Sequence, residues 1–231
     1  MASADLKKIA LLRNLPPKQL KRIAAIAREE EFPAGAMIIK KSEPAEDLFL
    51  VISGRIKIFC YSSSRKRKTF AYLGPGDFFG ELAVIADVGR SAWAEAVAAC
   101  RLITIHKKDL RRLLLSDTKF CFNMLQAVAE RLRHADEEIE NLLFRNVLGR
   151  VSKTLHNLAL SCGETYKEGL LLTERYTHQE LADLVGTTRE PLSRALSMLK
   201  RADLVESVKG HIYIRKPGKL EELISTSVET R

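Results

Sequence analysis

The stretch THQELADLVGTTREPLSRALSMLKRADLV, residues 177–205, carries the clearest structural signal in this chain of 231 residues. Thr177 and Glu180 have the spacing of a capping box, in which each side chain satisfies a free backbone N–H at the start of a helix. Gly186 tolerates the positive φ of a sharp turn, and Thr188 can cap a second helix behind it. The stretch therefore predicts two short helices joined by a tight turn.

The second of these helices carries charged residues near its start and apolar residues on one face. Its inward face is expected to consist of Leu192, Ala195, Leu196 and Leu199. Small Ala182 lets the two helices approach, which is typical of a helix-turn-helix. The second helix of that motif places its N-terminal end in the major groove of DNA, where Arg189 can bind guanine and Glu190 can accept from cytosine. The alternative is a solvated charged face on a helical hairpin, and the capping box, the turn glycine and the spacing from Arg189 to Arg194 favour DNA.

Two β-rich runs follow, residues 204–208 and 212–214, on either side of Lys209 and Gly210. They predict a two-stranded wing that can touch DNA phosphates. The tail after Pro217 is expected to hold one helical turn and a frayed end. The residues expected to contact DNA are Thr177, Gln179, Thr187, Thr188, Arg189, Glu190, Ser193, Arg194 and Lys209.

Composition restricts the classes of protein to which the chain can belong. Hydrophobic residues make up 46% and charged residues 29%, which is ordinary for a globular protein, and no apolar run approaches the roughly 18 residues of a membrane span. The net charge of +9 suits either solubility or a polyanionic partner. Residues 1–146 hold 25 basic and 18 acidic residues, whereas residues 147–231 hold 13 and 11, so the C-terminal part would bind DNA through a few placed arginines.

Cysteine spacing and the N-terminus bear on the cellular compartment. The cysteines Cys60, Cys100, Cys121 and Cys162 are too far apart for a CxxC motif, and the N-terminus lacks the apolar stretch of a signal peptide. We therefore expect reduced, mostly buried thiols in a cytoplasmic protein, with no membrane association and no metal site. The chain has no P-loop, HExxH or GxSxG motif, so we expect it not to be an enzyme.

Residues 32–104 have β-rich patterning, after a helical segment over residues 5–30 that Pro16-Pro17 divides into two short helices. The β-rich runs are residues 37–39, 48–52, 55–61, 70–73, 92–97 and 102–105. Many short strands at regular turns predict a small barrel or roll. Residues 55–59 alternate like a half-exposed strand. The run Arg65–Lys68 is interpreted as a solvated hairpin turn, with a binding patch as the alternative.

Residues 107–146 return to helical patterning and contain a narrow apolar seam. The seam residues alternate at spacings of three and four, as in a coiled coil. They are Leu125, Val128, Leu132, Ala135, Ile139 and Leu142. The helix could pack on its own domain, but so narrow a seam favours a second copy of the same helix, and therefore a homodimer.

Several stretches together resemble the cAMP receptor protein/FNR family of bacterial transcription regulators, and the resemblance covers nearly the whole chain. Residues 181–205 resemble the DNA-reading segment of that family, and LFLVISGRIKIF, residues 48–59, resembles its β-roll. FGELA at 79–83 and GRSAW at 89–93 resemble its phosphate-binding cassette. The resemblance implies an α+β fold with an N-terminal cyclic-nucleotide-binding β-roll, a long dimerisation helix and a C-terminal winged helix-turn-helix.

The cassette resemblance also implies a set of ligand residues. Gly80 would permit close backbone approach, Glu81 can accept from a ribose 2′-hydroxyl, Arg90 can pair with a cyclic phosphate, and Ser91 can add a hydroxyl donor. Arg90 could also supply the cation that a buried Glu81 needs. The alternative is an Arg–Glu pair that serves only the structure of the roll. The expected ligand residues are Gly80, Glu81, Leu82, Arg90, Ser91, Arg131, Ala135 and Asp136.

Two of these positions depart from the cAMP-responsive members of the family, in which two polar residues reach the adenine amino group. Ala135 offers no hydrogen bond here. Asp136 could accept from adenine N6, or from guanine N1 and N2. We therefore expect cAMP or another cyclic nucleotide as the effector, with the base left open, and no cofactor.

These inferences predict a sequence-specific transcription regulator with a sensor domain over residues 1–118, a dimerisation helix over 119–146 and a DNA-binding domain over 147–231. Its partners would be double-stranded DNA at a palindromic site, with TGTGA-like half-sites by resemblance, and RNA polymerase if it is an activator. One alternative is the same regulator with a different effector or none. Another is a cyclic-nucleotide-binding module that acts through protein partners.

Overall fold

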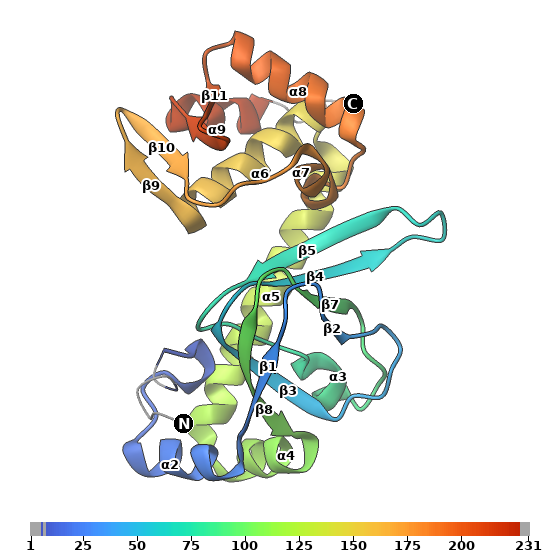
Figure 1. Cartoon of the computed structure of the whole chain (residues 1–231), viewed down its shortest axis with the longest axis vertical. Coiled ribbons are helices and arrows are strands. Elements are labelled where there is room, and N and C mark those ends of the chain that lie inside the picture. Colours follow the sequence, from blue (N-terminus) through green and yellow to red (C-terminus); the bar gives the residue numbers. More distant parts are fainter. Residues whose placement is uncertain (1–5, 7, 227–231) are drawn as a thin grey trace. The chain divides into compact units, whose positions relative to one another are not determined.

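Two four-stranded antiparallel sheets form the roll near the start of the chain (Figure 1). The first has the strand order β1-β8-β3-β6 and the second β2-β7-β4-β5. The strands are β1 Arg28–Phe32, β2 Met37–Ile39, β3 Asp47–Ser53, β4 Ile56–Tyr61, β5 Arg67–Leu73, β6 Phe78–Phe79, β7 Trp93–Ala96 and β8 Cys100–His106. This computed structural model describes residue 6 and residues 8–226. The small roll expected from the recurring β-rich runs is confirmed.

The chain divides into two compact units, Met1–Arg133 and His134–Arg231. The division falls inside the long helix α5, Thr118–Phe144, which follows helix α4, Lys107–Ser116. The domain boundaries expected at 118/119 and 146/147 lie near the two ends of α5, whereas the division between the compact units lies inside this helix. The expected boundaries remain predictions.

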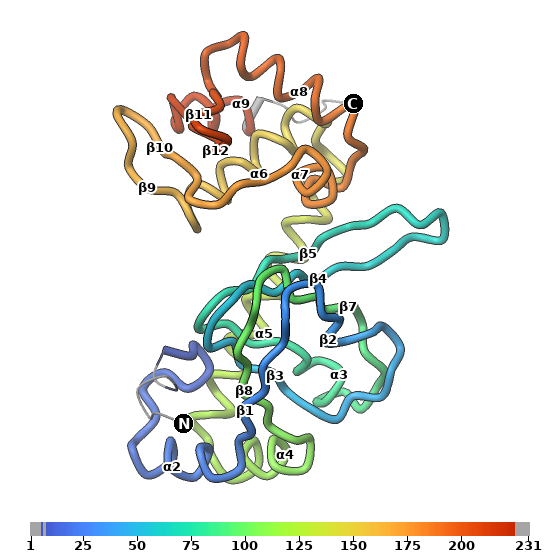
Figure 2. Tube along the Cα trace, in the orientation of Figure 1, coloured from blue at the N-terminus to red at the C-terminus, as the bar shows by residue number. Residues whose placement is uncertain are grey.

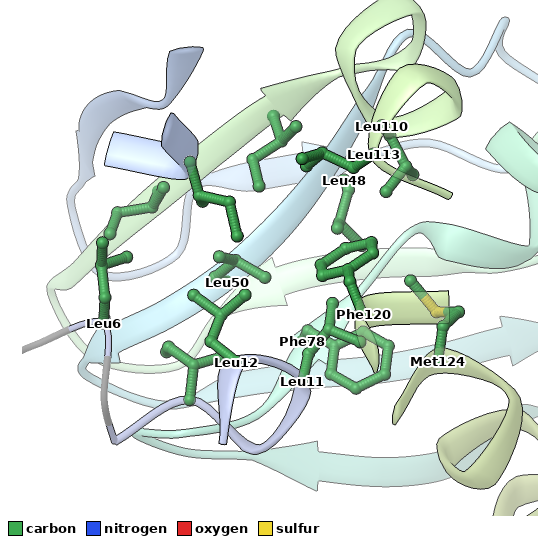
Figure 3. Packing of buried hydrophobic residues seen from close by; sticks show 14 of the residues in the cluster. Leu6, Leu11, Leu12, Leu48, Leu50, Phe78, Leu110, Leu113, Phe120 and Met124 are labelled. Carbon is green, nitrogen blue, oxygen red and sulfur yellow. The ribbon is translucent and has the colours of Figure 1, made fainter. Parts of the chain in front are cut away.

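The first core of the N-terminal unit lies where strand β3 meets helices α4 and α5 (Figure 3). Leu48 and Leu50 on β3, Leu110 on α4 and Phe120 on α5 are all 0% exposed. Burying a side chain of this size contributes roughly 1.5–3 kcal/mol. The first turns of the long helix are therefore anchored to the roll.

A second core fills the interior of the roll with the side chains that point the other way from β3. Val51, Ile56 and Leu102 are 0% exposed there. Because Leu50 and Val51 are adjacent and both buried, β3 is covered on both faces. This explains why its sequence is continuously apolar rather than alternating.

Two strands of the roll were not expected. Strand β1 has the sequence REEEF, and four of its five residues are exposed, so it has no hydrophobic period to detect. It forms at the sheet edge because its backbone pairs with β8, with Glu29 beside Arg101 at 3.2 Å and Glu30 accepting from Thr104. Strand β6 has only two residues. The first of the two expected N-terminal helices is also only a 3-10 turn, η1 at Ala10–Leu12, before helix α2, Pro17–Ile26.

The expectation of a half-exposed strand over residues 55–59 is wrong. Lys57 is only 7% exposed, and its ammonium lies 2.9 Å from Glu95 on β7. An ion pair with the neighbouring strand lets a charged residue lie where alternation alone predicts a solvated one. The thiols also differ from expectation, since only Cys100 is buried and Cys121 is exposed.

The C-terminal unit packs four helices around a third antiparallel sheet, of order β11-β12-β10-β9. Figure 2 shows the path of the chain through these elements. The elements of the C-terminal unit after α5 are α6 Val147–Cys162, β9 Gly163–Tyr166, β10 Gly169–Leu172, α7 His178–Val185, α8 Arg189–Arg201, β11 Val205–Val208, β12 His211–Ile214 and α9 Pro217–Thr226. Strand β9 was not expected, and α9 is longer than the predicted single turn because Leu220, 0% exposed, anchors it in the core. The frayed end predicted beyond it falls on residues 227–231, which lie outside the described residues.

Candidate functional site

A left-handed glycine opens the candidate ligand site of the roll. Gly80 has φ +88° and precedes the short helix α3, Glu81–Ala86. A Cβ atom built on Gly80 would lie 2.6 Å from Nη1 of Arg90 and 3.1 Å from the carbonyl oxygen of Asp47. Only glycine therefore fits both the backbone conformation and the space beside the arginine.

Arg90 is a buried cation whose hydrogen-bond acceptors are neutral backbone carbonyl groups. It is 7% exposed, and it donates to the carbonyl oxygens of Gly80 at 2.9 Å and Asp47 at 2.8 Å. Burial lowers the pKa of this guanidinium, and the neighbouring carboxylates of Asp47 and Glu81 offset part of that shift. Among the residues that the structure describes, no carboxylate lies within ion-pair distance of Arg90. The arrangement leaves a desolvated positive charge without an adjacent anion.

Glu81 is buried even more deeply, with 1% of its surface exposed. Its ion-pair partner is Arg131 of α5 and not Arg90 as the sequence suggested, so that expectation is corrected. Arg131 donates to Oε1 of Glu81 and to the carbonyl oxygen of Phe78, and its guanidinium lies 4.4 Å from the centre of the Phe78 ring. Oε2 of Glu81 has no hydrogen-bond partner in the described part of the chain. One carboxylate oxygen is thus paired and the other is unmatched.

The remaining expected ligand residues are more open. Leu82 is 47% exposed, and Ser91 directly follows the buried arginine with its side chain exposed. Ala135 and Asp136 are exposed on the part of α5 that belongs to the second unit. Contacts of these four residues with a ligand remain predictions.

The start of the helix-turn-helix has the predicted capping box. Thr177 Oγ1 accepts from the Glu180 backbone N–H at 3.2 Å, and the Glu180 carboxylate accepts from the Thr177 N–H at 2.8 Å. Gly186 closes α7 with φ +73°. Thr188 occupies the N-cap position of α8 but makes no side-chain capping bond, so its expected capping role is wrong. The motif is fixed by its first cap, its glycine turn and its buried face rather than by the second cap.

The buried and exposed faces of α8 separate as predicted. Leu192, Ala195, Leu196 and Leu199 are each at most 5% exposed. On the outer side Arg189 is exposed, and Arg194 donates to Glu190 at 2.5 Å. The side chains of the DNA-reading end are thus solvated, and two of them already form a pair with each other.

Two further polar contacts lie across the motif. His178 Nδ1 is 2.9 Å from Ser193 Oγ, which links the start of α7 to α8. Gln179 donates to Asp183 at 2.7 Å, and Asp183 is 2% exposed. Sequence reasoning missed His178, although its place between two expected DNA contacts was a usable signal.

The wing is confirmed as the hairpin β11–β12. Lys209 and Gly210 form its two-residue turn, with φ +50° and +84°, the positive values that such turns require. Arg215 donates to Glu206 at 2.6 Å and lies 3.3 Å from Asp203, and these acidic neighbours raise the pKa of Arg215. Lys209 is therefore held at the tip of a braced hairpin.

The predicted seam along α5 is largely exposed in the single chain. Leu125 is 63%, Leu132 64% and Ile139 55% exposed. Val128 differs, because it is partly buried against the first core. Large apolar residues at this exposure favour contact with another surface, and their assignment to a dimer interface remains a prediction.

Comparison with known proteins agrees with this geometry. Residues 29–117 match the family described as Cyclic nucleotide-binding domain, and residues 149–223 match the Crp-like helix-turn-helix domain. A cyclic nucleotide-binding domain followed by a Crp-like helix-turn-helix domain, in a chain whose relatives are transcription regulators, defines a DNA-binding transcription regulator and not an enzyme.

Individual relatives then identify the family. The chain is 30% identical over 213 residues to the Cyclic AMP receptor protein of Thermus thermophilus, covering 92% of this chain and 95% of the relative. It is 31% identical to the cAMP-activated global transcriptional regulator CRP of Salmonella typhimurium, over 77% of this chain and 84% of that protein. The chain belongs to the CRP family of transcription regulators. DNA binding and dimerisation follow from that membership.

A solved structure supports the fold. A CooA mutant from Carboxydothermus hydrogenoformans matches with a TM-score of 0.77 and 22% identity, over 88% of this chain and 90% of that one. None of the helices in the described part of the chain combines the length and apolarity needed to cross a membrane. Within the same residues, no three His, Cys, Asp or Glu side chains are grouped so as to hold a metal ion.

Proposed function

We propose that the chain is a homodimeric regulator whose affinity for a palindromic DNA site is controlled by cAMP bound in the β-roll. Two unmatched buried groups support the ligand site. Arg90 is a desolvated cation held by backbone carbonyls, and Oε2 of Glu81 has no donor among the described residues. Leaving a buried polar group unpaired costs about 1–3 kcal/mol. A cyclic ribose phosphate carries an anionic phosphate close to a free 2′-hydroxyl, so a single ligand supplies both partners.

The roles of the residues follow from their donors and acceptors. Arg90 would pair with the cyclic phosphate, and Ser91 would add a hydroxyl donor. Glu81 would accept from the ribose hydroxyl through Oε2 while Arg131 keeps its bond to Oε1. Gly80 and Leu82 would line the approach to these groups.

Arg131 connects the ligand site to the helix that carries the seam. It reaches Glu81 from α5, directly before Leu132 of the seam. A ligand that binds Glu81 acts on the carboxylate that holds Arg131, and therefore on the position of that helix. If the ligand has a higher affinity for one arrangement of α5 and its partner, binding shifts the population toward it.

The base is expected to contact α5 near Asp136. The relatives that match over most of their length are named for cAMP, and Asp136 can accept from the N6 amino group of adenine. A guanine base would instead offer N1–H and N2–H to the same carboxylate. Ala135 can supply only an apolar contact. We therefore propose cAMP as the effector and keep cGMP as its direct competitor in the test.

The seam residues would join two chains in parallel, and the two α8 helices would read half-sites about one DNA turn apart. The residues expected at the DNA are Thr177, Gln179, Thr187, Thr188, Arg189, Glu190, Ser193, Arg194 and Lys209. If the regulator activates transcription, RNA polymerase is its expected protein partner.

Calorimetric titration tests the ligand site directly. The full chain is titrated with cAMP, cGMP and 2′-deoxy-cAMP, and the series is repeated with Glu81→Ala. We expect cAMP to bind more tightly than 2′-deoxy-cAMP by about 1–3 kcal/mol, and we expect Glu81→Ala to remove the difference. Equal affinity of the parent protein for cAMP and 2′-deoxy-cAMP would exclude the proposed role of Glu81.

Fluorescence anisotropy on a TGTGA palindrome then tests whether a cyclic nucleotide controls the affinity of the protein for DNA. Protein is titrated at fixed salt with no nucleotide, with cAMP or with cGMP. Tightening by cAMP alone is the expected result, and tightening by cGMP alone would transfer the effector role to guanine. DNA affinity that neither nucleotide changes would contradict control by either of them.

A further inference from the structure

The basic excess of this chain is concentrated outside its DNA-reading domain. Residues 55–73, which form the β4–β5 hairpin, contain six cationic residues and no acidic residue. Residues 147–231, which include the helix-turn-helix, contain 13 basic and 11 acidic residues. The positive charge that a DNA-binding protein is expected to carry therefore gathers on a hairpin of the sensor unit, and the reading of DNA bases does not account for it.

Some cations of the hairpin are already used by the fold. Lys57 is buried against Glu95, and Arg55 stacks on the Tyr72 ring at 4.2 Å. The two cations at the tip differ, because Arg65 and Lys66 are exposed. Neither forms an ion pair with a residue in the described ranges, 6 and 8–226. Their charge is available to a partner.

The tip is an ordered turn. The Arg65 N–H donates to the Ser62 carbonyl at 2.9 Å, and the Ser62 N–H donates to the Lys66 carbonyl at 2.8 Å. Ser62 Oγ accepts from the Lys66 N–H at 3.1 Å and lies 2.9 Å from Ser64 Oγ. Because the backbone is fixed, a ligand that binds here does not have to order the loop.

The composition of the tip indicates the class of partner. Residues 62–68, SSSRKRK, carry seven consecutive side chains that can donate hydrogen bonds and none that is apolar. Protein–protein interfaces are built around an apolar or aromatic centre. None of the seven tip residues is apolar, and the exposed aromatic residues of the hairpin, Tyr61 at 44% and Phe70 at 56%, lie outside the tip. Contacts to DNA phosphates come from arginine, lysine and serine and need no apolar centre. The tip therefore fits a sugar–phosphate backbone better than it fits a protein surface.

We propose that the β4–β5 hairpin tip, residues 62–68, is a second DNA-binding site that contacts phosphates of the duplex beyond the half-sites. It supplies affinity without sequence preference. Arg65 and Lys66 each neutralise one phosphate, and the serine hydroxyls add donors. This second site goes beyond recognition of the half-sites by α8 and rests on that recognition, which is measured separately below.

The experiment compares two duplexes with the same palindrome, in the presence of cAMP. The short duplex ends at the half-sites, and the long one extends two helical turns further, about 21 base pairs, on each side. The variant is Arg65→Gln with Lys66→Gln. The matched control is Lys18→Gln with Lys21→Gln on α2, which removes the same total charge from two other exposed cationic residues.

On the long duplex, we expect the hairpin variant to lose at least about tenfold in affinity. The slope of log K against log salt should also fall by roughly 0.9 for each phosphate that the variant no longer neutralises. On the short duplex, the hairpin variant should match the parent, which also shows that it is folded. The α2 control should match the parent on both.

Three results would overturn the proposal. The hairpin variant could match the parent on the long duplex, it could weaken both duplexes equally, or the α2 control could lose as much as the hairpin variant. If long-duplex binding is unchanged while transcription with purified RNA polymerase falls, the hairpin binds a protein instead. Failure of even the parent on the short duplex would contradict the half-site recognition and not the hairpin.

Discussion

The ligand site of the roll and the DNA-reading face of α8 use charge in opposite ways. In the roll, Glu81 and Arg90 are at most 7% exposed, and each lacks a partner that a ligand could supply. On α8, Arg194 and Glu190 are 65% and 79% exposed and already pair with each other. Under the proposed function, the sensor would recognise its ligand through a few desolvated groups, whereas the reader would contact DNA through many solvated groups. Replacing a charged side chain should therefore reduce binding affinity more in the sensor than in the reader.

The largest expected effect is on nucleotide binding by Arg90→Gln. Removing one partner of a buried charge pair costs about 2–5 kcal/mol, so cAMP affinity should fall by about 30-fold or more in calorimetry. Arg112→Gln on α4 is the control, because that side chain is 72% exposed. If both variants bind cAMP like the parent, Arg90 serves the structure of the roll alone, and the contrast between the two regions fails.

A second test asks whether the two regions are independently stable. Leu192 on α8 is 0% exposed, and Leu192→Ala should destabilise the C-terminal unit by about 2–5 kcal/mol. Trp93, the only tryptophan, lies in the other unit, so its fluorescence should follow an unchanged urea transition while circular dichroism shows an earlier one. Met198→Ala, 47% exposed on the same helix, is the control. A parallel shift of both signals would mean that the units unfold together.

A smaller effect is expected at the DNA-reading face. Arg189→Ala should weaken binding by about 1–3 kcal/mol and relax the preference at one base pair, measured by anisotropy on duplexes with single substitutions. Arg201→Ala, at the far end of α8, should leave base preference unchanged. Uniform weakening on every duplex would show that Arg189 contacts only a phosphate.

The smallest effect concerns a surface ion pair of the sensor. Lys107 and Arg111 lower the pKa of Asp87 below its ordinary value of 3.8, so the carboxylate stabilises the fold above that pH and loses this effect as pH falls through the lowered value. Asp87→Asn should therefore lower the urea midpoint slightly near pH 7, and the difference should shrink as the pH falls below about 4. A difference that is constant down to pH 3 would contradict this origin.

Most of the helix-turn-helix could be predicted from the sequence because its signals are local, and the missing side-chain cap of Thr188 is the exception. The capping box of Thr177 and Glu180 and the positive φ at Gly186 involve neighbours within a few residues. The candidate ligand site could be predicted only as a set of residues. Arg90 was expected to neutralise Glu81, whereas the carboxylate bonds Arg131, which is 50 residues distant in sequence. No local pattern reports which of two arginines reaches a buried carboxylate.

Most of the helices and strands, the buried and exposed faces of α8 and the apolar period of α5 could be inferred from the sequence, because caps, turns and hydrophobic periods act between residues close along the chain. Tertiary packing was needed to establish that REEEF forms strand β1, that Lys57 is buried against Glu95, and that Glu81 keeps one oxygen unmatched. These outcomes depend on which backbone or charge lies opposite in space. An unpaired strand edge or a desolvated charge costs free energy whatever the local sequence, so the fold as a whole settles their partners.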